Sequence, residues 1–200
     1  LLRMSYPSPL DSCGLRNWAT RAVGELAHRR EEINALNVFP VPDSDTGSNM
    51  AHTMEAAVAE LDKGDDVADS LARGAVRGAR GNSGMVLSQV LRGVAESTVD
   101  SVIDGSVFAR SLQQAVELVD LAIAEPVEGT VITVLRAAAE AADDSAARPG
   151  ATLHGIVSGA ISAARTALER TPSQLPALQE AGVVDAGGAG LVILLSLIHI

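Results

Sequence analysis

Apolar residues recur at intervals of three and four along almost the whole chain, and alternating apolar and polar runs are absent. This spacing places apolar side chains on one face of a helix, so it predicts helices and no sheet. The main stripes are 15–27, 87–94, 108–123, 131–142 and 153–168. Shorter helices are expected near 48–61, 66–78 and 174–181, with a last one near Gly190.

Turn residues separate these segments, at 63–66, 104–105, 125–126, 148–150 and Thr171-Pro172. Because the connections are short, neighbouring helices should run antiparallel. The sequence therefore predicts an all-α fold, an up-and-down antiparallel bundle or barrel of about eight helices. We expect an N-terminal extension over 1–14 and one domain over 15–200. Its last helix is expected to be cut short, as in a C-terminally truncated fragment of a longer protein.

Composition narrows the classes of function. The formal net charge is −10 and no basic run occurs, which argues against a nucleic-acid partner. Cys13 is the only cysteine, which excludes an intrachain disulfide and favours a cytoplasmic location. No signal peptide is evident, and the apolar tail from Leu191 to Ile200 is shorter than the ~20 residues that a membrane span needs. Lys63 is the only lysine, so bound phosphates would need metal ions, backbone N–H groups or arginines.

Polar loops that contain glycine or paired acids each precede an apolar helical run. They span 37–49, 78–84, 128–130 and 184–190. In an up-and-down bundle these loops would meet at one end, with Asp43 and Ser83 on the same side. Converging helix N-termini would attract an anion with several charges.

The first loop holds Asp43 and Asp45 between Pro42 and the start of a helix. Hard oxygen ligands in a tight turn suit Mg²⁺. The pair alone is equally well explained as helix caps, since Asp is common before a helix. Phe39 is expected in the core. A metal site beside helix N-termini that attract an anion favours a phosphate-handling site.

Several known templates are excluded. A calcium loop needs glycine and glutamate where Ser48 and Met54 stand. The chain contains no P-loop motif, and its glycines at 78, 81 and 84 do not match the dinucleotide fingerprint. The four histidines show no metal-ligand spacing.

The four loops in this order resemble the motifs of the ATP-binding domain of the dihydroxyacetone kinase family. The first is NVFPVPDSDTGSNM from Asn37, the second is GARGNSGMVLSQVLRG from Gly78, and EGT and VDAGGAG follow from Glu128 and Val184. The branch that they most resemble is the N-terminal domain of bacterial fatty acid kinase. The resemblance covers roughly Trp18 to Leu195.

The resemblance implies an eight-helix barrel that binds ATP and Mg²⁺, two ions being expected, at one end. Asp43 and Asp45 would hold the metal, and Asn37 would be a weaker ligand or a hydrogen-bond partner. The nucleotide would contact Thr46, Gly47, Asn49, Gly81, Asn82, Ser83, Gly84, Thr130, Asp185, Gly187 and Gly188. The 185–190 loop would close over the adenosine. No protein nucleophile is expected, because phosphoryl transfer depends on positioning and charge neutralisation.

The same resemblance implies transfer of phosphate to the carboxylate of a fatty acid that a separate fatty-acid-binding protein presents, giving an acyl phosphate. Two alternatives stay open: the nucleotide-binding domain of a dihydroxyacetone kinase, and a non-catalytic nucleotide-binding regulator. A homodimer is one possible assembly. The family usually has glycine where Ser44 stands, and the backbone angle there would cost serine ~1 kcal/mol.

Overall fold

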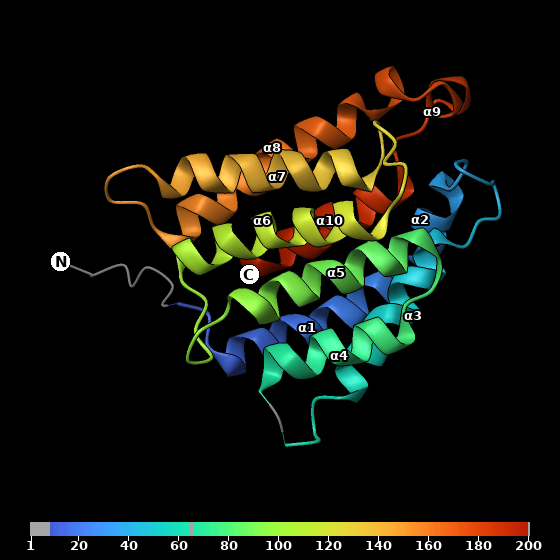
Figure 1. Cartoon of the computed structure of the whole chain (residues 1–200). Coiled ribbons are helices and arrows are strands. Elements are labelled where there is room, and N and C mark those ends of the chain that lie inside the picture. The colour runs from blue at the N-terminus through green and yellow to red at the C-terminus, as the bar shows by residue number, and fades with distance from the viewer. Residues whose placement is uncertain (1–8, 65, 200) are drawn as a thin grey trace.

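The computed structural model describes residues 9–64 and 66–199. Within these residues the chain forms ten α-helices, one short 3₁₀ helix and two isolated β-bridges, with no strand (Figure 1). The all-α prediction is therefore confirmed. Residues 1–8 of the expected N-terminal extension, and Asp65 of the expected 63–66 turn, lie outside the described residues.

The helices follow the predicted stripes closely. They are α1 (Ser12–His28), α2 (Arg30–Leu36), α3 (Thr46–Ala59), α4 (Val67–Gly78), α5 (Gly81–Ser97), α6 (Gly105–Ala122), α7 (Val131–Ala146), α8 (Leu153–Gln174), α9 (Pro176–Ala181), α10 (Ala186–Ser196) and η1 (Leu197–His199). The predicted number of about eight is not confirmed, because α2 was not expected. α1 also begins inside the segment expected to be an extension.

The long helices run up and down, so their starting points divide between two ends of the bundle (Figure 1). Helices α1, α4, α6 and α8 begin at one end, which we call the cap end. Helices α3, α5, α7 and α10 begin at the other, which we call the pocket end. The cap end lies on the left of Figure 1.

At the cap end, each helix is closed by the side chain that precedes it. The four capping oxygens lie 2.8–3.1 Å from backbone nitrogens of the first turns, and belong to Asp11, Asp66, Asp104 and Thr152. A side-chain oxygen in this position accepts a hydrogen bond from an N–H group that has no partner inside the helix.

Helix α10 is buried on nearly all sides, between α7 and α8 on one side and α1, α2 and α3 on the other. Its apolar sequence explains this position, since a helix without a polar face must be covered. A side chain at Gly190 would overlap Met50 of α3, so glycine permits this close packing. The indole of Trp18 donates to the Leu194 carbonyl at 3.0 Å. No helix in the described part of the chain is long and apolar enough to cross a bilayer.

The turn expected at Thr171-Pro172 is wrong, because α8 continues to Gln174. Proline has no N–H group to bond the carbonyl four residues earlier, which belongs to Leu168. The Thr171 hydroxyl donates to that carbonyl instead, at 2.7 Å. The helix therefore tolerates the proline in its last turn.

Candidate functional site

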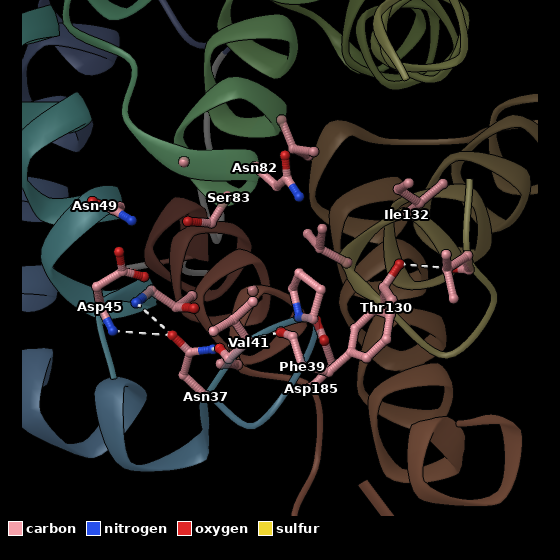
Figure 2. A pocket seen from close by; sticks show the side chains of 18 of the residues that line it. Asn37, Phe39, Val41, Asp45, Asn49, Asn82, Ser83, Thr130, Ile132 and Asp185 are labelled. Atoms are coloured by element: carbon pink, nitrogen blue, oxygen red, sulfur yellow. Dashed lines mark hydrogen bonds between the residues drawn. The ribbon is translucent and has the colours of Figure 1, made fainter. Parts of the chain in front are cut away.

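One cavity of about 390 Å³ opens at the pocket end and receives residues from all four polar loops (Figure 2). Its volume lies in the usual range for small-molecule sites, ~300–1,000 Å³. Asp43 and Ser83 both line it, so the expectation that the loops share one end is confirmed. Asp45, Asn49 and Ser83 lie on one side, across from Thr130 and Ile132 on the other (Figure 2).

Asn37 organises the loop that carries the two acids. Its side-chain oxygen accepts hydrogen bonds from the backbone nitrogens of Asp45 and Thr46, at 3.0 and 3.1 Å. Its side-chain nitrogen donates to the carbonyls of Val41 and Phe39, at 3.1 and 3.5 Å. The residue is only 5% exposed. Asn37 therefore fixes the loop and caps α3 from eight residues upstream of Asp45.

This geometry argues against Asn37 as a direct metal ligand, one of the two roles expected for it. An amide oxygen has two lone pairs, and here both receive N–H groups. The other expected role, that of a hydrogen-bond partner, agrees with the contacts.

Asp45 occupies the N-cap position of α3, yet its side chain makes no capping hydrogen bond. Asp43 is exposed, and no hydrogen bond to its carboxylate occurs within the described residues. The capping interpretation of this pair is therefore wrong, since Asn37 caps the helix instead. Both carboxylates line the cavity, and neither has a hydrogen-bond partner among residues 9–64 and 66–199.

A metal ion at this place would need ligands from outside the protein as well. No group of three or more His, Cys, Asp or Glu side chains is arranged to hold a metal in the part of the chain that the structure describes. Mg²⁺ is commonly bound by one or two carboxylates, with waters and substrate phosphates completing its shell. The pair Asp43 and Asp45 fits that requirement.

Ser44, between the two acids, has a φ of 55°. This is the left-handed region, which glycine enters freely and serine only at a cost. The strain expected at this residue is confirmed. It turns the chain so that the acids on both sides reach the same cavity.

The start of α5 offers free backbone donors. The N–H groups of Gly81, Asn82 and Ser83 make no hydrogen bond within residues 9–64 and 66–199, and Arg80 before them provides no side-chain cap. The N–H of Gly84 bonds the Arg80 carbonyl at 3.0 Å and is already used. Free N–H groups at a helix N-terminus bind phosphate oxygens, helped by the helix dipole.

Gly81 shows why this turn needs glycine. Its φ is 63°, and a Cβ there would lie 2.7 Å from the side-chain nitrogen of Asn49. The missing side chain lets the start of α5 approach the first turns of α3. Thr53 joins the same two helices, because its hydroxyl accepts from the Arg80 nitrogen at 3.4 Å.

Asp185, unlike Asp43 and Asp45, is used by the protein itself. It caps α10 by accepting from the Gly188 nitrogen at 2.8 Å, and its own nitrogen donates to the Thr171 hydroxyl at 3.1 Å. Burial raises the pKa of Asp185 to about 6, although backbone hydrogen bonds from Gly188 and Val131 act in the opposite direction. The residue is 7% exposed.

The segment from Ala186 to Gly190 is helical, so the expected loop conformation is wrong there. Gly188 does not line the cavity, and a Cβ there would lie 2.9 Å from Val134. Gly47 and Gly84 are likewise absent from the lining, since they face α2 and Thr53. These three glycines permit close packing, while the other predicted site residues all line the cavity.

The charged side chains that line the cavity are all acidic. Its lining includes four carboxylates and, among the described residues, no lysine, arginine or histidine; the acids are Asp43, Asp45, Glu125 and Asp185. A polyphosphate could enter only with cations. Metal ions are therefore the natural source of positive charge here.

Sequence reasoning missed the apolar part of the cavity. Its members include Phe39, Val41, Val86, Ile123, Val127, Val131 and Ile132. Phe39 was expected in the core, but it is half-buried and lines the cavity. A signal was present, since two prolines interrupt this apolar segment directly before the acids. Core residues rarely stand in such a stretch.

Comparison with known proteins agrees with this site. The DAK2 domain profile matches residues 40–199. The chain belongs to the DAK2 domain family. Protein YloV of Bacillus subtilis is 39% identical over 173 residues, which is 84% of this chain and 31% of that protein. An uncharacterized protein of Staphylococcus saprophyticus is 38% identical over 174 residues, with the same coverage. The chain thus spans less than a third of these DAK2 relatives.

A solved structure shares the fold at low sequence identity. It is the dihydroxyacetone kinase from C. freundii in complex with AMP-PNP and Mg²⁺, with a TM-score of 0.67 and 18% identity. The match covers 100% of this chain and 36% of that one. The likeness shows that the DAK2 chain has the fold of a domain within that kinase.

Proposed function

We propose that this DAK2 domain binds Mg²⁺–ATP in the pocket-end cavity and takes part in phosphoryl transfer. One observation carries the proposal. Within the part of the chain that the structure describes, N–H groups at the start of α5 and the carboxylates of Asp43 and Asp45 have no hydrogen-bond partner, share one cavity, and have no basic side chain beside them in its lining. In a nucleotide bound with metal ions, the phosphates would supply negative charge for the N–H groups, and the metal ions would supply positive charge for the carboxylates.

The residues divide the work by chemistry. Asp43 and Asp45 would hold Mg²⁺, which neutralises charge on the phosphate oxygens during transfer. The N–H groups of residues 81–83 and the Ser83 hydroxyl would hold the phosphates in place. Thr46 and Asn49 would complete that side of the cavity, and the apolar side would cover the nucleoside.

We infer the acceptor of the phosphoryl group from the branch of the family that the first motif resembles. The first motif favours transfer to the carboxylate of a fatty acid, presented by a separate fatty-acid-binding protein, to give an acyl phosphate. The named relatives leave this acceptor open. The C. freundii neighbour makes dihydroxyacetone the second candidate.

Calorimetry tests the nucleotide site. AMP-PNP is titrated into the chain with Mg²⁺ and again with EDTA in place of the metal. We expect binding to need Mg²⁺, because the four carboxylates of the cavity repel a bare polyphosphate. Equal affinity in the two titrations would overturn the proposal.

A second assay distinguishes the acceptors. The chain is mixed with radiolabelled ATP and either oleate on a fatty-acid-binding protein or dihydroxyacetone. Labelled acyl phosphate, trapped with hydroxylamine, supports fatty acid kinase activity. Labelled dihydroxyacetone phosphate supports the alternative. Tight nucleotide binding without transfer to either acceptor favours a regulator.

A further inference from the structure

The connection between α6 and α7, residues 123–130, forms one wall of the cavity. We call it the wall loop. It contributes Ile123, Glu125, Val127 and Thr130 to the lining. It is exposed along most of its length, and Val127 is 38% exposed although it is apolar. Burial holds its last two residues, Gly129 and Thr130, so other contacts must hold the exposed part in shape.

Arg136, on the second turn of α7, joins the wall loop to the neighbouring helix. One guanidinium nitrogen donates to Glu128 Oε1 at 2.9 Å. The other donates to Asp120 Oδ1, near the end of α6, at 2.7 Å. A planar guanidinium suits this task, because its fixed fork can hold two carboxylates at once. Asp120 and Glu128 lie on either side of the wall loop's apolar residues.

The second oxygen of Glu128 extends the network. Glu128 Oε2 accepts from the Thr133 hydroxyl at 2.7 Å, and that hydroxyl accepts from the Gly129 nitrogen at 2.9 Å. Thr130 then donates to the Val127 carbonyl at 2.7 Å. The chain of contacts thus runs from α6 through Arg136 and Glu128 to Thr133 in the first turn of α7.

Exposed ion pairs contribute little to the stability of a whole fold. Here, however, Arg136 bonds both the wall loop and the helix before it, so its loss would act on the loop. A loop that is mobile in the free protein must be ordered when a ligand binds, and that ordering weakens binding. Helices α5, α6, α7 and α8 pack against one another through many other contacts, so their packing does not depend on this network.

We propose that Arg136 is a positioning residue, which fastens the wall loop in the shape that contacts the nucleoside part of the bound nucleotide. This rests on the proposed function for the identity of the ligand. Arg136 does not line the cavity and acts through Glu128 and Asp120. Its effect should therefore fall on the nucleoside and not on the phosphates across the cavity.

The test uses Arg136→Met, which keeps the aliphatic stem and removes both hydrogen bonds. We expect faster amide exchange in peptides that cover 121–131, and AMP-PNP affinity roughly five- to tenfold weaker in the presence of Mg²⁺. Affinity for Mg²⁺-tripolyphosphate, which lacks a nucleoside, should not change. Arg136→Lys should recover part of the affinity, because an ammonium can still hold one carboxylate.

Two further variants make the result specific. Arg92→Met breaks a comparable surface pair with Glu96, 2.8 Å apart, on α5. It should change neither wall-loop exchange nor nucleotide affinity. Glu128→Gln removes the charge from the loop side of the network, and it replaces Arg136→Met if that variant does not fold. It should give the same changes to a smaller degree.

Unchanged exchange and unchanged AMP-PNP affinity in Arg136→Met would overturn the proposal. Equal weakening of AMP-PNP and tripolyphosphate would also overturn it, since that pattern indicates a general structural effect. If the wild-type chain bound no nucleotide, the proposed function would fail. The exchange measurement would still decide whether Arg136 fastens the wall loop.

Discussion

The two ends of the helical bundle begin their helices in different ways. At the cap end, each of the four long helices is closed by its own preceding side chain. At the pocket end, within the described residues, only α10 is closed in this way, by Asp185. The cap end is complete by itself, whereas the pocket end leaves N–H groups and carboxylates for a ligand.

The difference shows that the same residue type can have opposite roles. Asp104 and Asp45 both stand directly before a helix, and sequence alone cannot tell them apart. Asp104 caps α6, while Asn37 takes the capping position at α3 and leaves Asp45 free. An acid that is relieved of capping by a distant residue is a candidate ligand.

Removing a carboxylate at the pocket end gives the largest expected effect. Loss of residues that merely support metal ligands lowers metal affinity by ~10–100-fold, so loss of a ligand should cost about a hundredfold or more. We expect Asp45→Ala, and likewise Asp43→Ala, to lower the Mg²⁺-dependent affinity for AMP-PNP by that amount. The melting temperature should stay nearly unchanged, because neither carboxylate makes a hydrogen bond within the described residues.

Asp104→Ala is the matched control at the cap end. It should lower the free energy of unfolding by about 1 kcal/mol through loss of the cap, with nucleotide affinity unchanged. Calorimetry and thermal melts on the same samples measure both quantities. If Asp104→Ala weakened binding as much as Asp45→Ala, the division into two ends would be wrong.

Asp185 gives the next largest effect, and it depends on pH. The ordinary pKa of an aspartate side chain is 3.8, and burial raises the pKa of Asp185 to about 6 in the fold. The folded state therefore favours the protonated carboxyl. The stability that this group contributes is present in full below about pH 4 and is lost as the pH rises through about 6. A difference of about 2 in pKa corresponds to at most roughly 3 kcal/mol.

Asp185→Asn cannot ionise, so this part of the pH dependence should disappear. Urea unfolding without ligand, repeated between pH 4.5 and 7.5, measures it. The wild-type chain should lose stability relative to the variant as the pH rises across this range. If the free energies of unfolding of the two proteins changed in parallel with pH, Asp185 would not have the raised pKa that its burial predicts.

Much of this fold follows from the sequence, because local periodicity determines where helices form. The stripes at 108–123 and 153–168 became α6 and α8. Helix α2 was missed because its seven residues contain only two large apolar side chains, Ile33 and Leu36, too few for a period. Pro172 is a misleading turn signal because the compensating hydrogen bond comes from the side chain of Thr171.

The site was only partly predictable, for a different reason. Glycine and acid motifs located the four loops, but the role of each residue depends on contacts between loops. Asn37 reaches Asp45 over eight residues, and Asp185 meets Thr171 over fourteen. Spacing in the sequence contains no record of such pairs. For the same reason, the close packing of the glycines at 47, 84 and 188, which do not line the cavity, was not foreseen.

Asn37 offers a test that separates support from ligation. Asn37→Asp keeps an oxygen for the two N–H groups but cannot donate to the Val41 carbonyl, and it buries a charge. The variant loses a hydrogen bond and places a charge at a site that is only 5% exposed, so stability should fall by about 2 kcal/mol. Nucleotide affinity should fall with it, because the acid loop loses its brace. A rise in Mg²⁺ affinity would instead identify Asn37 as a metal ligand.

The smallest expected effect concerns backbone strain at both ends. Ser44 in the acid loop and Asp100 at the cap end have φ values of 55° and 53°. Replacing either by glycine relieves the left-handed strain but gives the unfolded chain more freedom. We therefore expect each substitution to raise the free energy of unfolding by about 1 kcal/mol or less. Chemical denaturation measures this gain for both variants.

The two substitutions should differ only in binding. Ser44 stands between the proposed metal ligands, so Ser44→Gly frees the torsions that aim Asp43 and Asp45. Asp100 is remote from the cavity, so Asp100→Gly should leave AMP-PNP affinity unchanged. If serine holds the acids in the geometry that Mg²⁺ requires, affinity falls in Ser44→Gly although the fold becomes more stable. If serine merely strains the turn, affinity rises with stability.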